Sequence, residues 1–357
     1  MNMTSARLKK KMRKTLFASV VSILAAAFCT VGSLGAEYLD ALFAPADPTE
    51  LSAAYERISY SPYCKGYETT ETYLETANFI LNKVAYESDG LRQSGMMGFP
   101  KGVSRAPLIM LNHAGFNGIT KYDIPRIAQF LERGYAVAAA TYRGEGGLAG
   151  LAEGGMDIIG DESRDILNLL ECAAGLEQID SERIAMVGVS HGGGLTISAL
   201  TQTRRPKAAA IVSAPTNLTN DKLKEMAAKW RVSPASVEVM LQLLMPIEGV
   251  AKMKHILGVK EKDASRIPAS RAEMLRRSPA LLADHIECPV MMWYGGQDPV
   301  AIWTDGKIIE SSLKERGLFS KVTVFENRHH SYNPDEIEDV FEEILTFFGT
   351  ALEAGTK

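Results

Sequence analysis

Apolar residues in this chain occur in short runs that alternate with longer stretches in which apolar residues recur every three or four positions. Short apolar runs predict buried strands, and the three-to-four spacing predicts helices that bury one face. The predicted strands are Phe79–Tyr86, Leu91–Phe99, Pro107–Asn112, Tyr135–Thr141, Arg183–Val187, Ala208–Val212, Pro289–Tyr294 and Lys321–Phe325. The predicted helices are Ile124–Arg133, Asp161–Ala174, a helix containing Leu195–Leu200, and one that opens at Asn333-Pro334. This alternation predicts an α/β fold with a mostly parallel sheet covered by helices on both faces.

Two segments depart from this alternation. Residues 37–78 are polar and aromatic and are interrupted by prolines, so we expect an N-terminal arm ahead of an α/β domain at 79–350. Residues 216–285 have helical character and are rich in Met, Lys and Arg. An insertion of this length predicts a helical lid over the functional site. His255 and His285 belong to this insertion or its exit, where we expect surface or packing roles.

The segment Gly188-Val189-Ser190-His191-Gly192 lies between a predicted strand and a predicted helix. The pattern Gly-x-Ser-x-Gly is typical of a sharp turn that exposes a serine hydroxyl above the edge of a sheet. Glycines on both sides lack a Cβ and let strand and helix approach each other closely. A serine hydroxyl is a weak nucleophile unless a base and a group that orients the base lie within reach. Ser190 is therefore the candidate nucleophile.

The acid and the base are expected after two later strands. Asp298 follows Pro289–Tyr294, although an Asp-Pro pair is also common in turns. His329 and His330 follow Lys321–Phe325, and we expect one of them to face the cleft. The order Ser, Asp, His differs from that of chymotrypsin and subtilisin and matches that of α/β-hydrolases.

The backbone N–H groups that would stabilise an oxyanion are expected in two places. One is His191, the residue after the nucleophile, and the other is the loop Ala114-Gly115-Phe116 after the strand that ends beside His113. We expect His113 to shape this loop rather than act as a base.

The glycine-rich segment 144–155 allows a different hypothesis. Gly144-Glu145-Gly146-Gly147-Leu148-Ala149 matches the Gly-x-Gly-x-x-Gly/Ala pattern of a dinucleotide-binding loop. Two residues separate it from the strand, more glycines follow, and no clear helix begins there. We therefore favour a flexible loop near the cleft and expect no cofactor.

Residues 79–350 resemble the catalytic domain shared by the prolyl oligopeptidase family and the dienelactone-hydrolase-like α/β-hydrolases. The matching segments are 86–90, 111–115, 133–137, 140–144, 179–184, 188–193, 295–298 and 329–332. The resemblance implies a Ser190–His330–Asp298 triad, because the family histidine is usually followed by a small residue and an aromatic, here Ser331 and Tyr332. His113-Ala114-Gly115 departs from the family's His-Gly-Gly, and the segment before residue 79 is too short for the β-propeller of true prolyl oligopeptidases.

The charges are unevenly placed along the chain. Residues 1–36 carry six basic residues and no acid, whereas the rest carries 33 basic and 43 acidic residues. An acidic body argues against nucleic acid as a partner, because no basic face is left to neutralise phosphates. A basic stretch, an apolar run and small residues near Ala36 predict a signal peptide and export, to the periplasm or outside the cell. The alternative is a membrane anchor over residues 15–36, which carry no charge and would be the only contact with a membrane.

The cysteines place few constraints on disulfide pairing. Cys29 follows the bulky Phe28, which argues against lipidation, and Cys64, Cys172 and Cys288 are far apart in sequence. One disulfide and three buried free thiols are both compatible with this spacing. No Cys-x-x-Cys pair indicates a metal site.

Two classes of function remain. The first is a serine hydrolase that cleaves a small carboxylic ester or, alternatively, a peptide bond, with the ester slightly favoured. The second is a non-catalytic ligand-binding protein on the same fold, because a fold does not determine a function.

Overall fold

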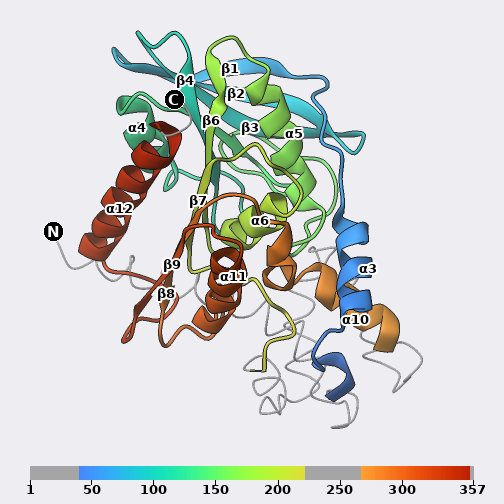
Figure 1. Cartoon of the computed structure of the whole chain (residues 1–357). Helices are drawn as coiled ribbons and strands as arrows, with labels where there is room; N and C mark the ends of the chain where they lie inside the picture. The colour runs from blue at the N-terminus through green and yellow to red at the C-terminus, as the bar shows by residue number, and fades with distance from the viewer. Residues whose placement is uncertain (1–39, 222–266, 354–357) are drawn as a thin grey trace, which may run out of the picture.

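The computed structural model describes residues 40–221 and 267–353, and these residues form one twisted sheet with helices on both faces (Figure 1). The nine strands have the order β1-β2-β3-β5-β4-β6-β7-β8-β9. Neighbours from β1 to β3 are antiparallel, as are β3 and β5, and all later neighbours are parallel. The predicted α/β class with a mostly parallel sheet is confirmed. The strands are β1 (Glu68–Glu75), β2 (Phe79–Ser88), β3 (Leu91–Pro100), β4 (Ala106–Asn112), β5 (Ala136–Ala140), β6 (Ile179–Val189), β7 (Ala208–Val212), β8 (Val290–Gly295) and β9 (Ser320–Phe325).

The helices bury the sheet from two sides. On one face lie α4 (Ile124–Glu132) and α12 (Pro334–Glu353), and on the other lie α5 (Glu162–Ala174), α6 (His191–Leu200) and α11 (Trp303–Glu315) (Figure 1). Each face has its own core of buried apolar side chains. Strands β4, β5, β7 and β8 and residues 184–188 of β6 are covered on both faces and consist almost entirely of buried residues. Their sequences are therefore nearly uninterrupted apolar runs.

The strand β1 corrects the predicted N-terminal arm. The arm does contain a helix, α3 (Pro48–Ile58), but Glu68–Glu75 pairs antiparallel with β2 and starts the sheet before residue 79. Six of the eight residues of β1 are exposed. A polar edge strand has no buried face to produce an apolar alternation, and its charges discourage pairing with other chains. Its sequence therefore reads as a loop.

A disulfide fastens the arm to the body. Cys64 precedes β1 and bonds to Cys172 on α5, while Cys288 is buried as a free thiol. The sequence left this pairing open, because 108 residues separate the two cysteines and only the fold brings them together.

Residues 222–266, which hold most of the predicted lid and His255, lie outside the described residues. The described end of this region comprises α10 (Ile267–Arg276) and the short 3-10 helix η3 (Pro279–His285), which pack against α3, α6 and α11. His285 stacks on Tyr55 with ring centroids 3.5 Å apart, which is a packing role. Whether the remainder covers the site stays a prediction.

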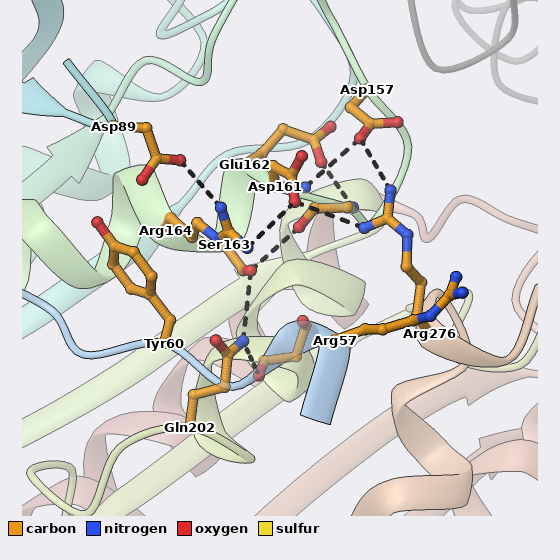
Figure 2. Close-up of polar contacts among 12 residues, drawn as sticks. Arg57, Tyr60, Asp89, Asp157, Asp161, Glu162, Ser163, Arg164, Gln202 and Arg276 are labelled. Carbon is orange, nitrogen blue, oxygen red and sulfur yellow. Dashed lines mark hydrogen bonds and ion pairs between the residues drawn. The ribbon is translucent and has the colours of Figure 1, made fainter. Parts of the chain in front are cut away.

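Buried ion pairs tie α10 to the loop that precedes α5. Arg277, directly after α10, is fully buried and contacts the Asp157 carboxylate at 2.6 Å. Arg276 reaches both Asp157 and Asp161 (Figure 2). Burial alone would raise the pKa of Asp157, but the two guanidinium groups hold it well below its usual range. Loop 157–161 is therefore held between α5 and α10.

The predicted leader at residues 1–36 lies outside the described residues, so export and anchoring stay predictions. Within residues 40–221 and 267–353, no helix has the length and apolar character needed to cross a membrane.

The pairing of Asp157 predicts how stability depends on pH. The carboxylate is favoured in the folded protein relative to the unfolded chain, where an Asp pKa is about 3.9. Its contribution is therefore complete above that pH and is lost as the pH falls through the lower folded-state pKa. We expect Asp157→Asn to lower the free energy of unfolding at neutral pH by about 3 kcal/mol.

Urea denaturation of the wild type, Asp157→Asn and a control variant, at pH values from 7 down to below 4, tests this pH dependence. Asp157→Asn should show a flatter loss of stability below about pH 4 than the wild type. Asp339→Asn, at an exposed position of α12, is the control and should follow the wild type. If the free energy of unfolding fell equally with pH in the wild type and in Asp157→Asn, the proposed contribution of the Asp157 ion pairs would be contradicted.

Candidate active site

The polar residues singled out in the sequence meet at the carboxyl edge of the parallel strands. Ser190 directly follows β6, Asp298 lies three residues beyond β8, and His330 lies five residues beyond β9. The carboxyl ends of parallel strands point to one edge of a sheet, where sites of open α/β folds collect. Three segments far apart in the chain are thereby brought within hydrogen-bond distance.

Ser190 sits in an unusual backbone conformation, with φ of 53° and ψ of −120°. Its N–H donates to the Val212 carbonyl of the neighbouring strand at 2.8 Å, and its carbonyl accepts from Gly193 and Gly194 in the first turn of α6. A positive φ costs a serine about 1–3 kcal/mol, and the surrounding bonds must hold it in place. The helix starts at His191, immediately after the nucleophile candidate and earlier than the predicted segment at Leu195.

The glycines beside Ser190 are required by close contacts. A Cβ at Gly192 would overlap the carbonyl oxygens of Asn112 and His113, and one at Gly188 would overlap Thr196 and the Gly192 carbonyl. The backbone of β6, β4 and α6 therefore approaches more closely here than any side chain allows.

The three side chains form a continuous hydrogen-bonded chain. Ser190 Oγ is 2.8 Å from His330 Nε2, and His330 Nδ1 is 2.8 Å from Asp298 Oδ2. With its proton on Nδ1, His330 donates to Asp298 and leaves Nε2 to accept from the serine hydroxyl. The other carboxylate oxygen, Asp298 Oδ1, accepts from the N–H groups of Val300 and Ala301, which fixes the carboxylate. Asp298 and Ser190 are each 5% exposed.

Its neighbour His329 points elsewhere. His329 is exposed and lies 2.9 Å from the Gln297 carbonyl through Nδ1. Of the adjacent pair, the structure thus brings His330 and not His329 to Ser190. Tyr332 adds a further contact, since its hydroxyl is 2.8 Å from Ser213 Oγ, directly after β7.

The two predicted sources of oxyanion donors lie side by side. His191 is the first residue of α6, so its N–H has no acceptor within the helix. The ring of Phe116 packs on the His191 ring with centroids 4.4 Å apart, which brings the loop 114–116 against the start of α6. Gly115 has a φ of 77°, a conformation that favours glycine. Which N–H of this loop would face an oxyanion stays a prediction.

Three residues that contact His113 or His191 were not recognised as functional candidates from the sequence. Glu145 lies 3.3 Å from His113, Glu162 lies 3.2 Å from His191, and Tyr142 stacks on His113 with centroids 4.1 Å apart. Glu162 belongs to the first turn of α5, beside the Asp157 network (Figure 2). The glycine-rich loop supplies Glu145 and packs against loop 113–119. It opens no helix, because the next helix is α5, so it lacks the feature that a dinucleotide-binding loop requires.

The model of the X-Pro dipeptidyl-peptidase (S15) family matches residues 42–332, which is most of the chain. The chain belongs to this family. It is a serine hydrolase, and the predicted resemblance to the α/β-hydrolases is confirmed. The family match also includes α3 and β1, so the arm and the sheet are matched together.

Several known proteins are similar to the chain. It is 30% identical over 232 residues to an uncharacterised 31.7 kDa protein of Escherichia coli, covering 60% of this chain and 80% of that one. It is 24% identical to dipeptidyl aminopeptidase BIII of Pseudoxanthomonas mexicana over 68% of this chain and 32% of that larger protein.

Two solved structures show the same fold. An acetyl xylan esterase from a Paenibacillus species superposes with a TM-score of 0.56 at 16% identity, covering 88% of this chain and 95% of that one. The acylaminoacyl peptidase of Pyrococcus horikoshii superposes with a TM-score of 0.57 at 20% identity, covering 78% of this chain and 42% of that one. At these low identities, the structural similarity is evidence for a shared fold only.

The tight backbone around Ser190 predicts the effect of one added methyl group. We expect Gly192→Ala to lower the free energy of unfolding by about 1–3 kcal/mol, because backbone atoms must move to admit the Cβ. Displacement of α6 should also remove most hydrolytic activity, measured with p-nitrophenyl acetate. The control is Gly175→Ala at the end of α5, where a Cβ would make ordinary contacts of 3.5 Å and longer. Equal stability and activity in the two variants would contradict the close packing.

Proposed function

We propose that this family member hydrolyses a small carboxylic ester through an acyl-enzyme formed on Ser190. The observation that carries the proposal is the unbroken chain from Ser190 through His330 to Asp298, with both links at 2.8 Å. A binding protein has no need of this arrangement, whereas acyl transfer needs a nucleophile, a base and a group that orients the base.

In the first half-reaction Ser190 Oγ bonds to the substrate carbonyl carbon, and its proton passes to His330 Nε2. The carbonyl oxygen becomes negatively charged and is stabilised by the His191 N–H and an N–H of loop 114–116. Asp298 orients His330 and stabilises its cationic form. The intermediate collapses when the bond to the leaving group breaks, and that group takes the proton from His330.

In the second half-reaction water attacks the acyl group on Ser190. His330 Nε2 accepts the proton of the water and returns it to Ser190 Oγ as the acid product leaves. Every step uses groups of this chain, the substrate and water, so the reaction needs no cofactor.

An ester is our first choice of substrate, because the two acidic side chains beside the oxyanion segments are buried and cannot bind the free amino group of a peptide. A dipeptidyl peptidase must also bind the free amino group of its substrate, which a carboxylate does best. In the described part of the chain, Glu145 and Glu162 lie beside the oxyanion segments, and both are buried against histidines. Neither is exposed to a substrate amine.

Peptide cleavage is the second candidate. It is favoured by the family, whose model is named for X-Pro dipeptidyl-peptidases, and by the similarity to dipeptidyl aminopeptidase BIII. The same triad serves both bonds, since His330 can protonate a leaving amine as well as a leaving alcohol.

Turnover of p-nitrophenyl acetate and of Ala-Pro-p-nitroanilide tests both candidates with the purified protein. We expect the ester to be hydrolysed faster, and Ser190→Ala to lower kcat about 10⁴- to 10⁶-fold. Ser198→Ala, which changes a buried serine further along α6, is the control and should keep the wild-type rate.

A faster reaction with the anilide would make the protein a peptidase. Equal slow rates for the wild type and Ser190→Ala on both compounds would contradict catalysis at Ser190 and favour a ligand-binding protein.

A further inference from the structure

Each segment expected to supply an oxyanion donor begins with a buried histidine that has a buried glutamate beside it. His113, ahead of loop 114–116, has Nε2 3.3 Å from Glu145 Oε2, and the two side chains are 0% and 2% exposed. His191, at the start of α6, has Nε2 3.2 Å from Glu162 Oε1, and both side chains are 2% exposed. The triad uses neither pair.

The two pairs are joined through aromatic rings. Tyr142 stacks on His113 and meets His191 edge-on, with centroids 4.1 Å and 5.8 Å away, and its hydroxyl donates to the His113 carbonyl at 3.2 Å. Phe116 then packs on His191 from the loop itself. The loop after β4 and the start of α6 therefore share one buried cluster, made of His113, Phe116, Tyr142, Glu145, Glu162 and His191.

The two glutamates also accept hydrogen bonds from backbone N–H groups of neighbouring loops. Glu145 Oε2 accepts from the Gly118 N–H at 3.0 Å, and Glu162 Oε2 accepts from the Gly160 N–H at 2.7 Å. The Leu148 N–H donates to the Ile119 carbonyl at 2.7 Å, so the glycine-rich loop and loop 113–119 are bonded directly as well. Each carboxylate thus connects an imidazole to the backbone of a loop.

Charge gives a second reason for the pairing. An unpaired buried carboxylate is costly, and near a developing oxyanion it would oppose the new negative charge. Burial alone would lower the pKa of His113, but Glu145 outweighs it and raises that pKa above its ordinary value. The Glu145 carboxylate thus favours the protonated form of His113, and in that form the two side chains together carry no net charge.

We propose that Glu145 and Glu162 are positioning residues of the oxyanion hole. Acting through His113 and His191, they hold loop 114–116 and the first N–H of α6 at a fixed separation across Tyr142. The inference rests on the proposed hydrolase function, because an oxyanion arises only if Ser190 attacks a carbonyl.

The test compares Glu145→Ala, Glu145→Gln, Glu162→Ala and Glu162→Gln with the wild type. The control is Glu153→Gln, which changes an exposed acid of the same glycine-rich loop. The measurements are kcat and KM for p-nitrophenyl acetate, inhibition by trifluoroacetophenone, and the thermal unfolding midpoint. The ketone forms a hemiketal with the serine, and the charged oxygen of this adduct occupies the same hole.

We expect Glu145→Ala and Glu162→Ala to lower kcat about 10- to 100-fold with KM changed less than about threefold. The ketone should bind more weakly by the same factor as kcat falls. Each Gln variant should recover part of the loss, because its amide oxygen still accepts a hydrogen bond from the loop N–H. If an Ala variant fails to fold, the matching Gln variant still tests the proposal. Glu153→Gln should match the wild type.

Wild-type kcat and ketone affinity in the folded Glu145 and Glu162 variants would overturn the proposal. So would a loss of kcat that follows the fall in unfolding midpoint while ketone affinity stays unchanged. The proposed function fails in a different way, since the wild type itself would then neither hydrolyse the ester nor bind the ketone.

Discussion

The site depends on one backbone conformation, the positive φ of Ser190 between β6 and α6. A serine does not adopt it freely, so the fold must stabilise it by about 1–3 kcal/mol. The hydrogen bond from Ser190 N–H to Val212 and the close approach of glycine backbones on both sides supply this constraint. The same turn places the hydroxyl beside His330 and starts α6 at His191, so the candidate nucleophile and one expected oxyanion donor come from a single turn.

Several buried carboxylates around that turn are held by hydrogen bonds or ion pairs. Asp298 is held by two backbone N–H groups, and Asp157 is held by Arg276 and Arg277. Buried charges are tolerated when they are paired and hydrogen-bonded, and a group held in this way has little freedom to move. Loop 157–161 links the two regions, because Glu162 follows it directly and reaches His191. The residues that support the site are therefore themselves buried.

The elements that were predictable from sequence are those with a strong local signal. The strand β7 coincides with its predicted limits, and β2 and β3 contain the predicted strands Phe79–Tyr86 and Leu91–Phe99. The edge strand β1 was missed because it is polar, and Cys64–Cys172 was undecided because only the fold brings the two cysteines together. Ser190, Asp298 and His330 were candidates because motif and chain order mark them. Glu145 and Glu162 carry no such mark, since an acid in a glycine-rich loop or a first helical turn looks solvent-exposed in sequence.

We propose above that Ser190 is a nucleophile activated by His330. The most direct test of this proposal is peptide mapping by mass spectrometry after treatment of the purified protein with a fluorophosphonate. If His330 activates Ser190, we expect one phosphonate per chain, on the peptide that contains Ser190. We also expect labelling of His330→Ala to be at least about 100-fold slower than labelling of the wild type. An adduct on a different serine, or labelling of Ser190 at the same rate without His330, would contradict the proposal.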